Sequence, residues 1–422
     1  MQLTDKYRKI DYGKLIYLER IRKRMTQEQL SRGICSVPYL SKLENQRINE
    51  PNPETISLLL KKLAIDYTSQ TSLVSEVLAD MEQWYNSITS KNKQDIDRIY
   101  IKLEQLQLNR YPDLNIWFKL ISIRFFIYQK DGKSAEKLKQ ELAGTLDKLD
   151  SYQKFYYLYF SGLIDCLNKA YTEGLCKLHE AEETANEYSV NDPELLYHLA
   201  LTYSHINNSS LAIYYSQSAK RFFDQNMNIY RGLDCQVILG INFLRIKRYD
   251  NAEQVFRDIL RISQSINDPK LPGKTYHNLG FLYAEKEDFT TALSYYHKAL
   301  DLKEVYSDSY CSTVLRIIHV HQQLGEVETA LEWVDQVIEK GCLDGSDIII
   351  QFQLKRLELL GADTAYYDYI KDTALPYFLK INNQKSVKLY AQKAALYYED
   401  NFHYKKANHY YKLILNQGGE IS

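Results

Sequence analysis

The chain has few of the residues that interrupt regular structure. It contains 16 Gly and 8 Pro among 422 residues, against averages of about 7% and 5% in soluble proteins. A sheet with many turns needs such residues, whereas helices joined by short connections do not. The 37 Tyr suit packing between helices. We therefore expect an all-α fold, in a chain that is too long for one compact core.

Long apolar segments are also lacking. No run approaches the roughly 18 apolar residues that a membrane-spanning helix needs. The sequence begins with the charged stretch MQLTDKYRKIDYGK, whereas a secretory signal would be apolar there. These features predict a cytoplasmic protein without a membrane partner.

Cysteine is sparse and scattered. No pair has the C-x-x-C spacing and no His lies at zinc-finger spacing, so the pattern predicts reduced thiols and no metal site. The six positions are Cys35, Cys166, Cys176, Cys235, Cys311 and Cys342.

Motifs of catalysis and of nucleotide binding are missing. The sequence has no H-E-x-x-H, G-x-S-x-G or G-x-G-x-x-G. Gly132-Lys133-Ser134 matches the end of a phosphate-binding loop, but Ile127 stands where that loop requires Gly. We therefore predict neither enzymatic activity nor a cofactor.

Charge is unevenly distributed along the chain. The formal net charge is only −1, yet the first 66 residues carry 13 Lys and Arg against 8 Asp and Glu. Their net charge of +5 leaves −6 for the remaining residues. A basic segment joined to an acidic one is typical of a DNA-binding module attached to a sensor that does not bind DNA.

The basic segment contains the start signals of several short helices. Residues 26–29, T-Q-E-Q, form a capping box, and Gly33 permits a tight turn. Ser36 is placed to cap a third helix over residues 37–45, and residues 52–63 begin with Asn-Pro and continue as a further helix. The spacing predicts a small four-helix module.

The apolar residues of this module predict its core. In the first helix Leu15, Leu18 and Ile21 fall on one face, and in the third helix Leu40 and Leu43 point inward. The other faces of the third helix carry small or polar side chains, as in a helix that enters a DNA major groove.

The strings T-Q-E-Q-L and Y-L-S-K-L-E-N resemble the phage-repressor-like XRE class of helix-turn-helix proteins, with a turn that is one residue shorter and reads G-I-C-S. The resemblance implies DNA binding, with Arg47 reaching the backbone beyond the third helix. A structural cap or a protein-binding head is the alternative. The implied DNA-binding residues are Gln27, Ser36, Val37, Pro38, Tyr39, Lys42 and Arg47.

The same resemblance assigns roles to most of these side chains. Gln27 and Ser36 would hold phosphates, and Val37, Pro38 and Lys42 would face base edges. Because Val37 and Pro38 replace the polar residues often found there, we expect less hydrogen-bond readout and contact with a thymine methyl group.

The rest of the chain contains a helical repeat. Residues 274–300, KTYHNLGFLYAEKEDFTTALSYYHKAL, match the tetratricopeptide pattern of two helices. Gly280 in the first helix and Ala292 in the second are small because the two helices cross closely there. Ala212, Ala252 and Ala292 are spaced by 40 residues each, which exceeds the usual period of about 34.

The small position of the second helix can be followed along the chain. It recurs at Ala135, Gly174, Ala330 and Ala407, with a poorer match near Ala365 and only a helical trace near Ile96. We therefore expect about eight or nine helix pairs. Stacked pairs of this kind form a right-handed superhelix with a concave surface that suits an extended or helical peptide.

Together the two parts resemble the RRNPP family of peptide-responsive regulators over the whole chain. This resemblance implies that a peptide pheromone lies along the groove and that asparagines of the first helices bind its backbone, because an Asn side chain both donates and accepts. Asn278 is the strongest candidate, although Asn at this position also serves helix packing in tetratricopeptide repeats. The weaker candidates are Arg124, His198, Asp234, Asn242, Lys274 and Asn408.

The sequence as a whole predicts a transcription regulator. We expect a DNA-binding domain at residues 1–67 and a repeat domain at residues 68–422 for peptide binding and dimerisation. The expected partners are double-stranded DNA with a palindromic operator, a short signalling peptide, and further copies of the chain in a homodimer or larger assembly. Two alternatives stay open, namely a Rap-like adaptor that sequesters a phosphorelay response regulator and a peptide-controlled regulator of a phage or plasmid.

Overall fold

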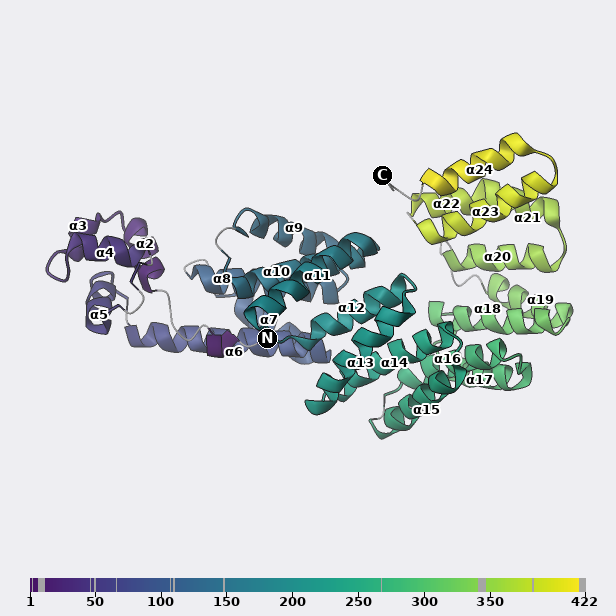
Figure 1. Cartoon of the computed structure of the whole chain (residues 1–422), viewed down its shortest axis with the longest axis horizontal. Helices are drawn as coiled ribbons and strands as arrows, with labels where there is room; N and C mark the ends of the chain where they lie inside the picture. The colour runs from purple at the N-terminus through teal and green to yellow at the C-terminus, as the bar shows by residue number, and fades with distance from the viewer. Residues whose placement is uncertain are drawn as a thin grey trace. The chain divides into compact units, whose positions relative to one another are not determined.

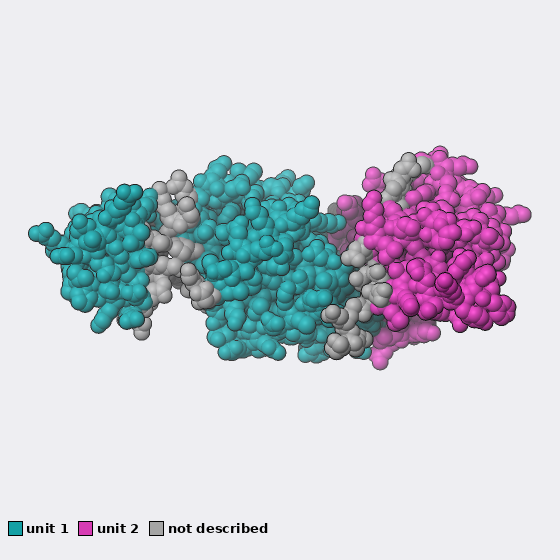
Figure 2. All heavy atoms as spheres, turned by 90° about the horizontal axis from the view of Figure 1, so that it is seen from above, with its two compact units in different colours: residues 1–242 teal, residues 243–422 magenta. Residues whose placement is uncertain are grey.

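The structure is a computed structural model in which every regular element of the described residues is a helix (Figure 1). The all-α expectation is therefore confirmed. The chain divides into two compact units, residues 1–242 and 243–422 (Figure 2). The described residues are 1, 3–6, 12–45, 47–48, 51–65, 67–106, 108, 111–146, 149–266, 268–340, 347–381 and 383–416.

Unit 1 consists of a short helix, a four-helix head, four helix pairs and most of α14. The last residues of α14 belong to unit 2. The helices are α1 (Leu3–Lys6), α2 (Tyr12–Arg22), α3 (Gln27–Ser31), α4 (Val37–Glu44), α5 (Pro53–Lys62), α6 (Tyr67–Ser90), α7 (Lys93–Glu104), α8 (Pro112–Tyr128), α9 (Gly132–Ala143), α10 (Ser151–Leu167), α11 (Tyr171–Tyr188), α12 (Pro193–His205), α13 (Ser209–Gln225) and α14 (Ile229–Arg245).

Unit 2 continues the same series of paired helices. Its helices are α15 (Tyr249–Ser265), α16 (Leu271–Glu285), α17 (Phe289–Asp301), α18 (Asp308–Gln323), α19 (Val327–Glu339), α20 (Asp347–Leu359), α21 (Asp363–Tyr369), the π-helical turn η3 (Ile370–Ala374), α22 (Leu375–Lys380), α23 (Gln384–Asp400) and α24 (Tyr404–Asn416). In chain order, the described part of α6–α24 contains nine successive pairs if α21, η3 and α22 count as one helix.

The head follows its sequence signals closely. The Thr26 hydroxyl accepts a hydrogen bond from the Gln29 N–H (3.1 Å), and the Gln29 side chain accepts one from the Thr26 N–H (2.8 Å). This is the predicted capping box. Gly33 has a φ of +79°, a conformation that favours glycine.

The core of the head differs from the prediction at one position of α2. Leu40 and Leu43 are buried as expected, and Leu15 is buried with them. Ile21, expected on the same face as Leu15, is 51% exposed, and Ile16 occupies the core instead. The prediction for Ile21 was wrong because the buried face of α2 includes both Leu15 and Ile16. Ile21 lies beside that face and not on it. The side chain of Leu18 lies outside the described residues.

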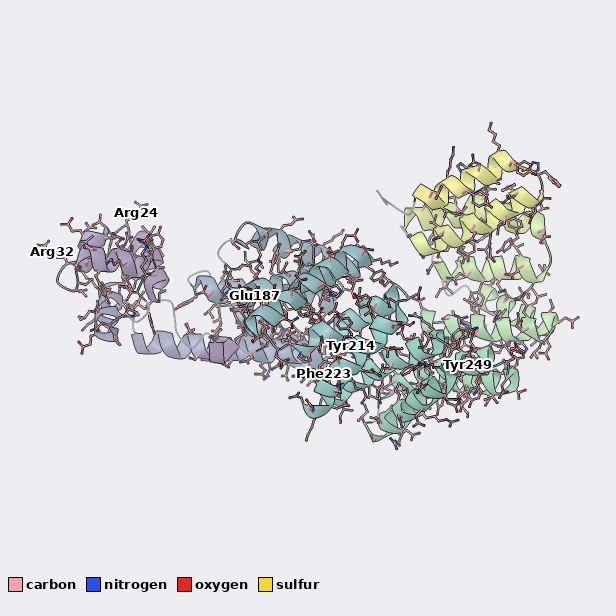
Figure 3. All side chains as sticks on the ribbon, viewed as in Figure 1. Arg24, Arg32, Glu187, Tyr214, Phe223 and Tyr249 are labelled. Carbon is pink, nitrogen blue, oxygen red and sulfur yellow. The ribbon has the colours of Figure 1, made fainter. Side chains whose placement is uncertain are left out.

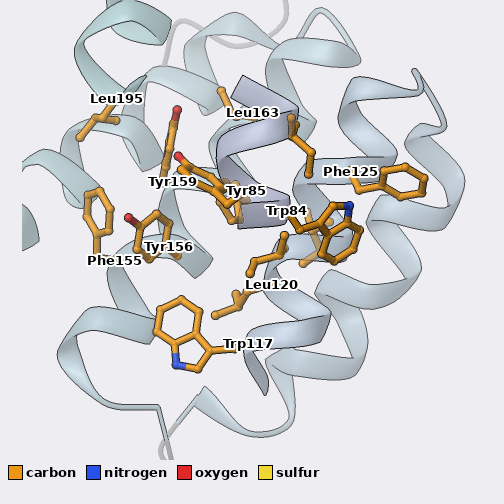
Figure 4. Close-up of a cluster of buried hydrophobic side chains, with 14 of the residues drawn as sticks. Trp84, Tyr85, Trp117, Leu120, Phe125, Phe155, Tyr156, Tyr159, Leu163 and Leu195 are labelled. Carbon is orange, nitrogen blue, oxygen red and sulfur yellow. The ribbon is translucent and has the colours of Figure 1, made fainter. Parts of the chain in front are cut away.

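Unit 1 has an aromatic core between its first helices (Figure 4). Trp84 of α6, Trp117 of α8 and Tyr156 of α10 are fully buried. The Trp117 and Tyr156 ring centroids are 5.6 Å apart with the rings nearly perpendicular, a favourable edge-to-face geometry. These large rings fill the space between consecutive pairs and hold them in one unit.

The short helix α1 packs against α6 of the repeats, not inside the head. Leu3 is completely buried in the core of unit 1. The Thr4 hydroxyl donates a 2.7 Å hydrogen bond to the Glu82 carboxylate on α6. The chain therefore contacts the repeats both before and after the head, which the sequence did not predict.

Replacing Leu3 with alanine is expected to lower the free energy of unfolding of unit 1 by about 2 kcal/mol, because a fully buried leucine is lost. Urea unfolding followed by the fluorescence of Trp84 and Trp117 measures this change. The matched control is Leu58→Ala, since Leu58 is 50% exposed. Equal effects of the two substitutions would contradict the docking of α1.

The helix pairs confirm the small positions read from the sequence. The second-helix residues Ala135, Ala212, Ala292 and Ala330 have no exposed surface. A methyl carbon added to Gly280 of α16 would lie 2.5 Å from the ring of Tyr296 on α17, so glycine is required there.

At the remaining repeat positions, the residues that match the repeat pattern well are buried and the poorer match is exposed. Ala252 and Ala407 are buried, and Gly174 of α11 lies against α10, where an added methyl would contact the Cys166 sulfur. Ala365, the poorer match, is exposed, and Tyr366 beside it is buried instead.

Candidate functional site

The exposed face of the head is built on α4 and its N-terminus. The Ser36 hydroxyl accepts a 3.3 Å hydrogen bond from the Tyr39 N–H and caps the helix. Val37, Pro38 and Lys42 are exposed, because the leucines of α4 fix its opposite face in the core. Tyr39 is half-buried, and its hydroxyl accepts a hydrogen bond from the N–H of Asn52, the residue that caps α5.

A buried ion pair sets the orientation of α4. The Arg20 guanidinium on α2 donates two hydrogen bonds to the Glu44 carboxylate, at 2.6 and 2.7 Å. Gln27 of α3 donates one further bond, at 2.7 Å, to the same carboxylate. One of its two amide hydrogens is thus used within the head, and the other is left for the predicted phosphate contact.

Cationic side chains surround this face. Arg24, Arg32, Lys42 and Arg47 are all exposed, and Figure 3 shows Arg24 and Arg32 extending outward from the head. Such a cluster attracts the phosphates of nucleic acids. The structure gathers the seven predicted residues in one small module, and their role in DNA contacts stays a prediction.

A second group of polar side chains lies on or next to α8, α12 and α14, each the first helix of its pair. We call this group the Arg231 cluster. It consists of Arg124, Asp192, Glu194, His198, Arg231 and Asp234. Arg231 of α14 donates two 2.6 Å hydrogen bonds to Glu194 of α12. It also bonds to Asp234 at 2.9 Å, and Lys91 bonds to the same carboxylate at 2.9 Å. Sequence reasoning missed Asp192, Glu194 and Arg231, because their partners lie far away along the chain.

Asp192 anchors this cluster to the aromatic core. The hydroxyls of Tyr85 on α6 and Tyr156 on α10 each donate a 2.8 Å hydrogen bond to its carboxylate. Asp192 also caps α12 by accepting a bond from the Glu194 N–H. Because three helices meet at this one carboxylate, the side chains of the cluster are held in place.

Arg124 of α8 is the unusual member of the cluster. Only 5% of its surface is exposed, and its Nε has no hydrogen-bond partner. In the described part of the chain no carboxylate lies within ion-pair distance of its guanidinium. Its charge interacts electrostatically with the buried Glu194 carboxylate, but no hydrogen bond satisfies its Nε, so Arg124 is a candidate for binding an anionic or carbonyl group of a ligand.

His198 of α12 is held neutral beside these cations. Its Nδ1 lies 2.6 Å from the Tyr159 hydroxyl and 2.7 Å from the Glu194 carbonyl oxygen. Burial, followed by the positive charges of Arg124 and Arg231, lowers its pKa well below the ordinary value. The imidazole therefore presents no positive charge of its own to a ligand.

The other candidate peptide residues occupy different places. Asn242 is fully buried and donates hydrogen bonds to the Ser204 hydroxyl and the Ile238 carbonyl. In unit 2, Asn278 is half-buried on α16, with the exposed Lys274 one turn before it. Asn408 is exposed on α24, the second helix of its pair. The structure thus brings Arg124, His198 and Asp234 together in unit 1, and Lys274 and Asn278 on one helix of unit 2.

A half-buried histidine lies next to Asn278. The His277 Nδ1 is 2.9 Å from the Thr313 hydroxyl, and Lys303 donates a hydrogen bond to the same hydroxyl. Burial and the charges of Lys303 and Arg316 lower the pKa of His277 to about 3.

This shift predicts a loss of stability of unit 2 in acid. Below the ordinary pKa of 6.5 the unfolded chain binds a proton that folded His277 refuses down to pH of about 3, so the free energy of unfolding falls by up to about 1.4 kcal/mol per pH unit. Unfolding followed at Trp333, the tryptophan of residues 243–422, measures this slope. The slope is expected to shrink in His277→Gln; an unchanged slope would contradict the assignment.

Metal-binding groups and membrane-spanning helices are both absent from the described residues. No group of three or more His, Cys, Asp or Glu there is arranged to hold a metal ion. No helix in the same residues is long and apolar enough to cross a bilayer. Five of the cysteines are free thiols, and Cys342 lies outside the described residues.

Comparisons with known proteins agree with both parts of the chain. Residues 16–69 match the helix-turn-helix family and residues 235–307 match the tetratricopeptide repeat family. The transcriptional activator NprA of Geobacillus stearothermophilus is 30% identical over 401 residues, covering 90% of this chain and 97% of that protein. The regulatory protein RapD of Bacillus subtilis (strain 168) is 25% identical over 66% of this chain and 81% of RapD.

Solved structures show the same fold. The apo form of the quorum sensor NprR from B. thuringiensis matches with a TM-score of 0.64 at 23% identity, covering 82% of this chain and 100% of that one. NprR in complex with its cognate peptide NprX matches with a TM-score of 0.59 at 25% identity, covering 82% and 98%. With the relationship to NprA along nearly its whole length, the chain belongs to the RRNPP family of regulators, among its helix-turn-helix transcription regulators.

Proposed function

We propose that this chain is a cytoplasmic, non-enzymatic transcription regulator whose repeats bind a short signalling peptide and thereby alter DNA binding by the head. Residues 1–67 would contact DNA and residues 68–422 would bind the peptide and form a homodimer. The observation that carries the proposal is the pairing of a basic helix-turn-helix head with a buried Arg124 on α8 of the repeats, whose Nε has no hydrogen-bond partner.

The Arg231 cluster supports peptide binding in particular. Arg124 offers a guanidinium, Asp234 a partly exposed carboxylate, and His198 a neutral imidazole. Opposite charges held at fixed positions suit the alternating donors and acceptors of a peptide backbone and its termini. The related NprR forms a complex with the peptide NprX, and Asn278 would add a backbone contact in unit 2.

Regulation would follow from the spacing of two heads. A dimer reads a palindromic operator only if its recognition helices meet adjacent major grooves. A peptide that binds one arrangement of the repeats better than another shifts the population of dimers toward it. Small movements of the repeats are then sufficient to change the affinity for DNA.

Fluorescence anisotropy with palindromic promoter fragments tests this function. The peptides to add are overlapping short synthetic segments from the C-terminus of a secreted propeptide encoded next to the gene. We expect binding that weakens steeply with salt, because phosphate contacts release counterions, and an affinity that changes when one peptide is added. Absence of salt-sensitive binding with every peptide and without any would refute the proposal.

A second function is favoured by the relatives named for response regulators. The response regulator aspartate phosphatase H of B. subtilis (strain 168) is 22% identical over 84% of this chain. The repeats could accordingly sequester a phosphorelay response regulator when no peptide is bound. A pull-down with the full chain, with and without peptide, tests this role, and recovery of no response regulator in either state removes it.

A further inference from the structure

A pocket of about 350 Å³ opens between α18, α20 and α23 of unit 2. Among the described residues its lining carries three cations, Arg316 from α18, Lys355 from α20 and Lys393 from α23, and one acidic residue, Glu358. Three positive charges against one negative charge leave an excess that repels itself and attracts an anion.

Each cation is positioned by neighbours that leave donors free. The Arg316 guanidinium stacks over the Phe281 ring, 4.6 Å from its centroid, a contact that fixes the plane and leaves the N–H edges available. Lys393 donates one 2.9 Å hydrogen bond to the Tyr366 hydroxyl, and an ammonium group has three donors. The site is thus held in place before a ligand arrives.

Lys355 and the apolar walls of the pocket determine which kind of ligand fits. Lys355 bonds to Gln322 at 2.9 Å and to Glu358 at 3.2 Å, which keeps its charge at the pocket. Leu315, Leu354 and Leu389 supply apolar walls beside the cations. An inorganic anion would leave these walls in contact with water, whereas a carboxylate on an aliphatic stem would satisfy both kinds of surface.

We propose that this pocket is a subsite for a carboxylate of the signalling peptide, from an acidic side chain or from the peptide's C-terminal residue. The inference rests on the proposed function and extends it to the chemistry of the ligand. Arg316 binds the two carboxylate oxygens as a fork, Lys393 and Lys355 add point charges, and the leucines contact the aliphatic stem.

The first experiment needs no knowledge of the peptide. Saturation-transfer NMR on the full chain compares N-acetylglutamate, inorganic phosphate and N-acetylglutaminamide, a glutamine compound that carries no carboxylate. We expect transfer to N-acetylglutamate only, reduced at least about tenfold in affinity by Arg316→Gln and by Lys393→Met. Equal transfer to the glutamine compound, transfer to phosphate only, or no effect of either variant would overturn the subsite. Thermal unfolding checks that both variants stay folded, and Lys298→Met serves as the control outside the pocket.

The second experiment separates the subsite from the proposed function. A peptide that changes DNA binding is compared with its C-terminal amide and with versions in which each Asp or Glu is changed to Asn or Gln. One of these changes should weaken binding to the unaltered chain at least about tenfold and have little effect on Arg316→Gln, because the pair is then already broken. If peptides bind but none of these changes matters, the subsite is overturned while the proposed function stands.

Discussion

Replacing Arg124 with glutamine is expected to weaken peptide binding at least about 30-fold, while the folded chain without peptide becomes no less stable. The first effect follows because a buried charge-assisted contact to ligand is worth about 2 kcal/mol or more when one partner is truncated. The second follows because only 5% of the Arg124 surface is exposed and its Nε lacks a hydrogen-bond partner. The described residues give the Arg124 side chain no ion pair or hydrogen bond that glutamine would break, and removing a buried charge removes its desolvation cost.

Two measurements on the same variant distinguish a ligand-binding role from a structural one. Isothermal titration gives the peptide affinity, and urea unfolding gives the free energy of unfolding. Arg221→Gln on α13 is the matched control, since Arg221 is exposed. A variant that loses stability and keeps its peptide affinity would show that Arg124 serves the fold, and the assignment of the Arg231 cluster to ligand binding would fail.

Replacing Arg20 with methionine is expected to unfold the head and abolish DNA binding, with little change in peptide affinity. The Glu44 side chain is only 2% exposed and would be left without its main partner. Breaking such a buried pair costs about 3–5 kcal/mol, which is a large fraction of the stability of a small module. Anisotropy with promoter DNA and circular dichroism measure the loss.

Two further variants make this prediction specific. Lys61→Met removes an exposed cation of α5 in the same head, and we expect a change below about 1 kcal/mol. The double variant Arg20→Met with Glu44→Met removes both charges and should regain most of the stability. If the single Arg20 variant still folds and binds DNA normally, the ion pair is not what orients α4.

Local rules in the sequence were sufficient for the helix caps of the head and for most of the repeat positions. The capping box at Thr26 and Gln29 depends on two side chains that are three residues apart, so their identities determine it. The closely packed small residues were found for a similar reason. Gly280 and Ala292 recur at a fixed spacing because every pair repeats the same helix crossing.

The turns within the pairs were harder to predict. Each of the nine turns, one within each helix pair, contains one residue with positive φ. Only two of these residues are glycines. At several of the other turns the cost of the left-handed conformation is offset by the cap that follows, as where Asp131 and Asp288 accept hydrogen bonds at the starts of α9 and α17. The helices α11 and α15 begin without a side-chain cap. The residues are Lys91, Lys130, Lys169, Asn207, Lys247, Glu287, Gly325, Gly361 and Phe402.

The sequence did not predict the contacts of the Arg231 cluster. Arg231 and Glu194 are separated by 37 residues and Tyr85 and Asp192 by 107, so no local pattern connects them. Arg124 was recognised by its place in the repeat, but its lack of a hydrogen-bond partner at Nε emerges only when the surrounding helices are packed. The docking of Leu3 on α6 is equally nonlocal.

The central claim is that peptide binding by the repeats and DNA binding by the head are energetically coupled. Titrating the peptide into the full chain with and without saturating palindromic promoter DNA tests this most directly. Linkage requires that DNA change the peptide dissociation constant by the same factor by which the peptide changes that of DNA. We predict a factor of about 5 or more. Identical peptide affinities in the presence and absence of bound DNA would contradict the account.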